Sequence, residues 1–239
     1  GRHGNVAPAV FMLLARIAVA VLAVWVAAWM ATGVLVESNY WNGDPALMQV
    51  ILAAVCALAV AGVAIAGRGV VTLSLWVSAG LGLFSLVGLI LFTIDPISRD
   101  TLGRPAGDTA SVVAGISVVM SALIVFWAHF GGDIARFVRA RGQAGSASLS
   151  AVAAVIPVLI LLAWGALLGG SSEEFRQALF ADFFDSVLGQ APLWYPIPAI
   201  LVGALPLLGI AALTIHSTSY ALLSVGAQLP RYAAATIVA

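Results

Sequence analysis

The chain has no lysine, a single cysteine and few charged residues of any kind. Charged residues make up 8% of its 239 residues, whereas hydrophobic residues make up 62%, and the mean hydropathy is +1.11. A soluble domain of this size does not bury so large an apolar fraction, so the composition excludes a soluble globular protein. The lone Cys56 excludes an intrachain disulfide. We therefore expect an all-α, polytopic integral membrane protein in contact with membrane lipid.

Residue patterns that carry catalysis or bind metals are also missing from the sequence. The three histidines, His3, His129 and His216, are far apart, and there is no phosphate-binding loop, no metal-ligand spacing and no nucleophile with a partner base. We expect no enzyme activity, no bound metal, no cofactor and no nucleic-acid partner.

Six apolar runs are long enough to cross a bilayer, for which a helix needs about 20 residues. They cover residues 6–36, 47–66, 70–94, 109–130 with a continuation to 141, 149–169 and 197–225, and a partial seventh begins at 232. We expect one transmembrane domain over 1–239. Because the chain opens without Met and stops inside an apolar run, we expect an internal portion of a longer protein whose remaining spans complete the domain, although a trimmed chain would look the same.

A short amphipathic helix is predicted over residues 172–188, between the last two full spans. Ser171 and Glu174 have capping-box spacing, and apolar residues then recur every four positions beside two acids. We expect this helix at the extracellular surface. Whether it covers a substrate path or only rests on the membrane interface stays open.

The arginines segregate to one side of the predicted spans. With a cytoplasmic N-terminus, the inner loops hold six arginines and one acid, Asp133, whereas the outer loops hold three arginines and nine acids. The positive-inside bias therefore places the N-terminus of this chain in the cytoplasm. We expect the membrane to be a bacterial-type plasma membrane. Arg16 lies within the first span. It is interpreted as reaching back to the cytoplasmic surface along its apolar stem, the alternative being a gating or substrate-facing charge.

The fourth span contains a glycine pair, Gly131-Gly132, between an aromatic segment and the acid Asp133. Glycines allow a helix to open, and opened helices inside a bilayer line the binding sites of secondary transporters. Trp127 would give a planar heterocycle a flat face for stacking. Alternatively the span ends at His129 and the glycines form a turn, and the residues favour neither interpretation.

The sixth span carries a polar run over residues 214–220, with five hydroxyl residues and His216. Ser and Thr can donate to carbonyls one turn back, so helix packing alone could explain the hydroxyls. A buried histidine in a membrane can bind substrate, relay protons or pack. We expect His216 to be functional, and Pro206 in the same span to bend the helix.

Together these residues resemble the nucleobase–cation symporter family, which includes purine and cytosine permeases and allantoin and hydantoin permeases. Three places carry the resemblance: Gly1-Arg2-His3-Gly4-Asn5 with Pro8-Ala9, then Trp127 through Phe137, and then Leu222 through Gly226 followed by Leu229-Pro230-Arg231. Their order, their spacing and the hydropathy between them agree over nearly the whole chain.

The resemblance implies a leucine-transporter-like inverted-repeat fold, of which this chain would hold the third to eighth spans and the start of the ninth. It implies a cation-coupled symporter that imports nucleobases or related planar heterocycles, such as cytosine, purines, allantoin or hydantoins, by alternating access. The substrate-binding residues that it implies are Trp127, Phe130, Gly131, Thr214, His216 and Ser217.

Departures from the family pattern keep other functions open. Val19 stands where an aromatic residue near the substrate is usual, and Ala211 and Ala212 stand where sodium-dependent members carry hydroxyls. The coupling ion is therefore either a proton or sodium, with the alanines arguing against the usual sodium site. The alternatives are a non-transporting membrane scaffold or receptor built on a decayed permease fold, and an amino-acid permease of the same fold.

Overall fold

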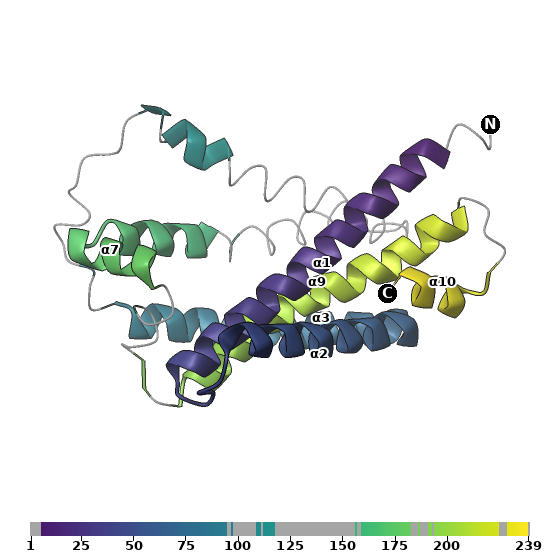
Figure 1. The fold of residues 1–239 in the computed structure, drawn as a ribbon. Helices are drawn as coiled ribbons and strands as arrows, with labels where there is room; N and C mark the ends of the chain where they lie inside the picture. Colours follow the sequence, from purple (N-terminus) through teal and green to yellow (C-terminus); the bar gives the residue numbers. More distant parts are fainter. Residues whose placement is uncertain are drawn as a thin grey trace. The chain divides into compact units, whose positions relative to one another are not determined.

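The computed structural model describes residues 6–94, 97, 109–110, 112–117, 156, 159–182, 186, 191–192, 194–224 and 229–238. Within these residues the protein is all-helical, with no strand, so the predicted helical class is confirmed there. The named helices are α1 (Val6–Glu37), α2 (Pro45–Ala66), α3 (Arg68–Phe92), α7 (Glu173–Ala181), α9 (Pro196–Ser224) and α10 (Arg231–Val238) (Figure 1). The chain forms two compact units, one of Gly1–Thr93 with Ala181–Ala239 and the other of Ile94–Phe180.

Four of the described helices are long and apolar enough to cross a membrane, namely α1, α2, α3 and α9. Each begins and ends within two residues of a predicted span. Large apolar side chains point outward from them: Leu58 on α2 and Trp76 on α3 are each 74% exposed. Such surfaces are stable against lipid hydrocarbon or further protein and not against water. The helices therefore have the character of an integral membrane protein, as the composition predicts.

Local sequence explains where α2 and α3 begin and end. Asp44 caps α2, because its Oδ1 accepts a hydrogen bond from the Ala46 amide at 2.9 Å, and Pro45 occupies the first turn, where a missing N–H costs nothing. Gly67 alone joins α2 to α3, with a φ of 106° that favours glycine. Thr93 ends α3, and its Oγ1 donates to the Leu89 carbonyl at 2.6 Å.

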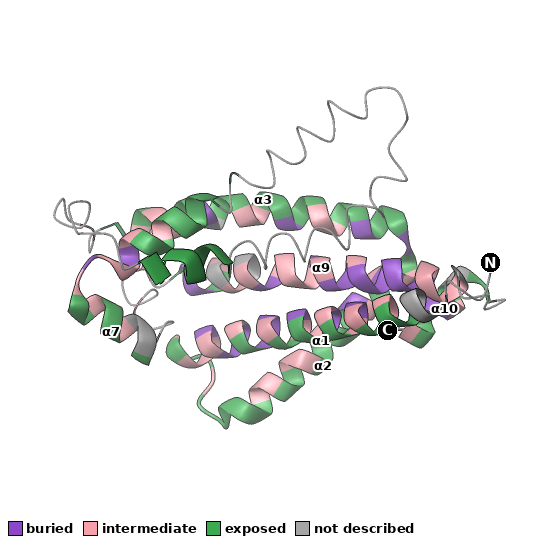
Figure 2. Ribbon diagram, turned by 90° about the horizontal axis from the view of Figure 1, so that it is seen from above, coloured by how far each residue is buried: buried purple, intermediate pink, exposed green. Residues whose placement is uncertain are grey.

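The packing of α1 against α9 forms the centre of the first unit (Figure 2). The buried side of α1 consists mainly of alanines at intervals of about one turn: Ala20, Ala23, Ala27, Ala28 and Ala31. Small side chains allow two helix backbones to approach closely, which favours helix association inside a membrane. The Met30 methyl lies against Gly203, where a Cβ would clash. Small residues therefore bring these two helices together.

The two helices run antiparallel, as two contacts at their ends demonstrate. Met30 of α1 lies against Gly203 of α9, and Arg16 of α1 is hydrogen-bonded to Ser217 of α9. The same number of residues separates Arg16 from Met30 as separates Gly203 from Ser217, so the register is constant between these contacts. An apolar core extends this contact to α2 and consists of Ala20, Ala23, Val60, Ala64, Ala211, Ala212 and Ile215.

The opposite side of α9 packs against α3. Ser78 of α3 donates to the Leu205 carbonyl at 3.2 Å, next to Pro206, which interrupts the backbone hydrogen bonds of α9. Near the start of α9, the buried Tyr195 ring meets Phe92 of α3 edge to face, with ring centroids 4.7 Å apart. Gly88 makes room for that ring, since a Cβ there would lie 2.7 Å from Tyr195.

The short helix α10 contacts both α9 and α2. Its Ala234 and Ala235 are fully buried. It begins at Arg231, where the partial seventh span was predicted from residue 232.

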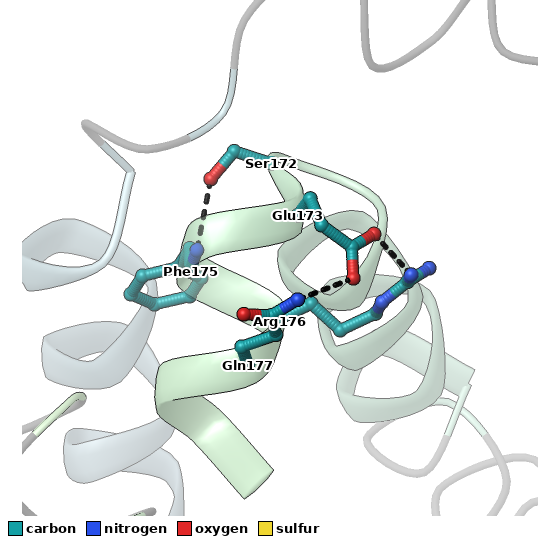
Figure 3. A network of polar contacts seen from close by, with 5 residues as sticks. All are labelled: Ser172, Glu173, Phe175, Arg176 and Gln177. Atoms are coloured by element: carbon teal, nitrogen blue, oxygen red, sulfur yellow. Dashed lines mark hydrogen bonds and ion pairs between the residues drawn. The ribbon is translucent and has the colours of Figure 1, made fainter. Parts of the chain in front are cut away.

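The second unit includes a short apolar helix over Leu159–Gly169 and nearly all of α7. Ser172 caps α7, because its Oγ accepts from the Phe175 amide at 3.0 Å (Figure 3). Ser171 instead donates to the Leu168 carbonyl and closes the preceding helix. The predicted cap at Ser171 was therefore wrong by one residue.

Side chains on the first turns of α7 are linked to one another. Glu173 forms an ion pair with Arg176 and accepts a hydrogen bond from Gln177 Nε2 at 3.0 Å (Figure 3). The helix ends at Ala181 and Asp182 lies outside it, so α7 is shorter than the predicted helix over 172–188, part of which lies outside the described residues. Of the fourth predicted span, residues 109–110 and 112–117 are described and helical.

Candidate functional site: a buried polar cluster between three helices

The polar run near the C-terminal end of α9 is buried in the first unit. Thr214, Thr218 and Ser219 are fully buried, and His216 and Ser217 are 5% and 2% exposed. Of these side chains, Ser217 contacts α1 and His216 contacts α2. We call His216, Ser217 and Arg16 of α1 the polar cluster, because these three residues make the contacts between helices described below.

Three of the hydroxyls donate to the backbone of their own helix. Thr214 donates to the Ile210 carbonyl and Thr218 to the Thr214 carbonyl, both at 2.7 Å, and Ser219 donates to the His216 carbonyl at 2.6 Å. This is the usual way in which Ser and Thr are accommodated in a membrane helix. Thr214 would therefore offer a ligand only the lone pairs of its Oγ1, because its proton is already donated.

Ser217 connects α9 to α1 through Arg16. The Nη1 of Arg16 donates to Ser217 Oγ at 2.8 Å, and both side chains are buried. A hydrogen bond with one charged partner contributes about 1.5–3 kcal/mol when both groups are removed from water. The bond therefore holds two helices in register and keeps a positive charge inside the apolar unit.

The position of Arg16 corrects the interpretation made from the sequence. Arg16 is only 7% exposed, and its guanidinium contacts Ser217 instead of reaching back to the surface along α1. The physical reason is that the small residues on α1 and α9 bring the helices close enough for the guanidinium to meet a buried hydroxyl. Reaching a surface would break that charge-assisted bond.

His216 connects α9 to α2. Its Nδ1 lies 3.4 Å from the Ala64 carbonyl, a long contact in which the imidazole must be the donor because a carbonyl only accepts. Its ring also meets Tyr220 edge to face, with centroids 5.3 Å apart. Successive residues of a helix point about 100° apart, so Ser217 faces α1 while its neighbour faces α2.

Ala211 and Ala212 of α9 lie in the apolar core. Ala211 is fully buried and Ala212 is 1% exposed, and both pack with Ala20 and Ala23 of α1. Carbon side chains supply no oxygen ligands for a hard cation. Among the described residues, no group of three or more His, Cys, Asp or Glu could hold a metal ion.

The other half of the predicted site lies outside the described residues: Trp127, Phe130 and Gly131. Of the remaining predicted residues, Ser217 contacts Arg16 of α1, His216 contacts Ala64 of α2, and the Thr214 hydroxyl donates within its own helix. A sequence signal for Arg16 existed. Four predicted spans lie between the first span and the sixth, so the first and sixth spans are expected to run antiparallel. Arg16 near the start of the first span and the polar run near the end of the sixth are then expected at the same level of the membrane.

No family model, curated protein or solved structure matches the chain. The resemblance to nucleobase–cation symporters therefore stays a prediction from the sequence.

Proposed function

We propose that the chain is part of a cation-coupled secondary transporter that imports nucleobases or related planar heterocycles by alternating access. The observation that carries the proposal is the polar cluster: a buried arginine, histidine and serine join three apolar helices. Ionisable residues inside membrane helices are costly, and they are concentrated on the pathways of substrates and ions.

In this proposal the two predicted halves of the site have different tasks. Trp127 stacks on the flat face of the heterocycle, and the backbone at Phe130 and Gly131 offers hydrogen bonds where the fourth span opens. The side chains of Ser217, His216 and Thr214 form hydrogen bonds with the polar edge of the ring. Buried hydrogen-bonding groups discriminate strongly between substrates, because a wrong substrate leaves these groups without partners.

The packing of Ala211 and Ala212 favours a proton over sodium as the coupling ion. His216 is the residue that we assign to proton coupling, since its ordinary titration range lies near neutral pH. The same alanines motivate the rival proposal, a non-transporting scaffold or receptor. One uptake assay distinguishes a transporter from a non-transporting scaffold or receptor.

The assay is uptake of radiolabelled cytosine, purines, allantoin and hydantoin by cells that lack their own permeases for these compounds. The cells express the protein from its complete reading frame. We expect accumulation of at least one compound, loss of that accumulation in Trp127→Ala, and normal accumulation in the matched variant Trp76→Ala, whose indole is 74% exposed.

Two outcomes would contradict the proposal in different ways. Accumulation that survives Trp127→Ala removes the stacking role of Trp127. A protein that reaches the membrane in normal amount but takes up none of the compounds favours the scaffold.

A further inference from the structure

We propose that the Trp194 indole binds the headgroup and ester region of the lipid bilayer and so fixes the depth at which the first unit sits in the membrane. The partner is a phospholipid surface, met where α3 ends and α9 begins. The inference goes beyond the proposed function, because it holds equally for a transporter and for a non-transporting scaffold.

One end of the first unit brings together the ends of four helices. Because α1 and α9 run antiparallel, the Glu37 end of α1 and the Pro196 start of α9 lie at the same end. Residues 38–44 connect α1 to α2, so α2 starts there as well. The last residue of α3, Phe92, contacts Tyr195 just before α9. We call this the aromatic end, after the aromatic residues that lie there: Tyr40, Trp41, Phe92, Trp194 and Tyr195.

Helix lengths and charges place the aromatic end at a membrane surface. The 25 residues of α3 extend over about 37 Å, at about 1.5 Å per residue, whereas the hydrocarbon core is about 30 Å thick. Arg68 begins α3 and is exposed at one end, and Asp44, which caps α2, is exposed at the other. Both charges require polar surroundings. The hydrocarbon core therefore fits between them, and the aromatic end reaches the headgroup region.

The backbone beside Trp194 requires the same depth. Residues 194–195 are not helical, and the Tyr195 amide donates to the Pro192 carbonyl at 2.8 Å in a turn. Residues 38–44 at the same end are not helical either. Irregular backbone exposed to hydrocarbon would leave amides and carbonyls without partners, so such segments lie where water or lipid headgroups supply them.

The Trp194 indole is packed on one side and exposed on the other. Its ring meets Phe92 and Tyr195 edge to face, with centroids 5.9 and 5.8 Å apart. Tyr195 is buried, whereas Trp194 is 56% exposed. An indole combines an apolar face with one N–H donor, which favours the boundary between hydrocarbon and the polar lipid groups. Its neighbours therefore hold an exposed indole at the depth where lipid offers both kinds of contact.

The test is fluorine NMR of the protein expressed from its complete reading frame with fluorotryptophan and purified into lipid nanodiscs. Trp194→Phe and Trp76→Phe each remove one resonance and so identify the two indoles. Trp194→Tyr identifies the same resonance if Trp194→Phe does not fold. The nanodiscs then receive lipids with a nitroxide either beside the headgroup or at the end of an acyl chain, and a nearby nitroxide broadens a resonance until it is lost.

We expect the headgroup nitroxide to remove the Trp194 resonance and the chain-end nitroxide to leave it. Trp76 is the matched control: its indole is 74% exposed on the interior of α3, so the chain-end nitroxide should remove its resonance.

Two results would overturn the inference. Loss of the Trp194 resonance with the chain-end nitroxide would place the indole in the hydrocarbon. Survival of that resonance with both nitroxides would mean that protein or bulk water, and not lipid, surrounds the ring. Neither result depends on uptake of any compound, so failure of this inference and failure of the transport proposal are distinguishable.

Discussion

Replacing Arg16 and Ser217 singly and together gives the sharpest prediction about the fold. Ser217→Ala leaves a buried guanidinium without its 2.8 Å acceptor, and Arg16→Met removes the charge and keeps an apolar chain in place of the aliphatic part of the arginine. A buried charge that loses its acceptor is costly, whereas replacing both partners by apolar groups is often nearly neutral.

The magnitude follows from the burial of the two groups. Interhelical hydrogen bonds in membrane proteins average about 0.6 kcal/mol, with a maximum near 1.7 kcal/mol. Because Arg16 is charged, and the two residues are only 7% and 2% exposed, we expect a coupling energy of about 1.5 kcal/mol, near the top of that range. Ser217→Ala alone should destabilise the protein more than the double variant does.

The assay is a double-mutant cycle on the free energy of unfolding, measured in lipid nanodiscs. The control cycle pairs Arg16→Met with Thr218→Ala, because the Thr218 hydroxyl donates to the Thr214 carbonyl of its own helix. The control pair should be additive within about 0.5 kcal/mol. Additivity of Arg16→Met with Ser217→Ala would refute the buried hydrogen bond and restore the interpretation that Arg16 reaches the surface.

Two pairs of glycine substitutions test the connection between α2 and α3 and the packing of α3 against Tyr195. Gly67→Ala should lower the free energy of unfolding by roughly 1–3 kcal/mol, because a φ of 106° is strained for any residue with a Cβ, whereas Gly62→Ala in the α2 interior, with open space around it, should be neutral or stabilising. Gly88→Ala should cost about 1–3 kcal/mol, since its Cβ would lie 2.7 Å from the buried Tyr195 ring, whereas Gly80→Ala on the same helix should not. Thermal unfolding of each purified variant measures both effects, and equal stability within either pair would contradict the corresponding contact.

The helices could be predicted from the sequence because their signals are local. Apolar runs of membrane-spanning length, the Asp44-Pro45 start of α2 and the single glycine between α2 and α3 mark boundaries without any knowledge of neighbours. Local sequence signals did not determine whether Ser171 or Ser172 caps α7. Two adjacent serines have the same chemistry, and only the backbone geometry decides which one accepts from an amide.

The polar cluster was only partly predictable, because it depends on contacts between distant parts of the chain. The polar run of α9, with His216 in it, was visible in the sequence as polar residues in an apolar span. The inward direction of Arg16 depends on the packing of α1 against α9, whose bonded residues are 201 positions apart. Likewise, only the packed helices show that His216 faces α2 while Ser217 faces α1.

The most direct test of the central claim is the accessibility of position 217 to a charged thiol reagent. Cys56 is the chain's one cysteine, so Ser217→Cys in a Cys56→Ala background gives a single reporter, and Ala212→Cys in the same background is the control for the apolar core. If the polar cluster lies on a substrate path, the reagent modifies Ser217→Cys, a transported heterocycle protects it, and Ala212→Cys stays unmodified. Equal resistance of both variants, or modification that no heterocycle slows, would mean that the cluster only packs helices together.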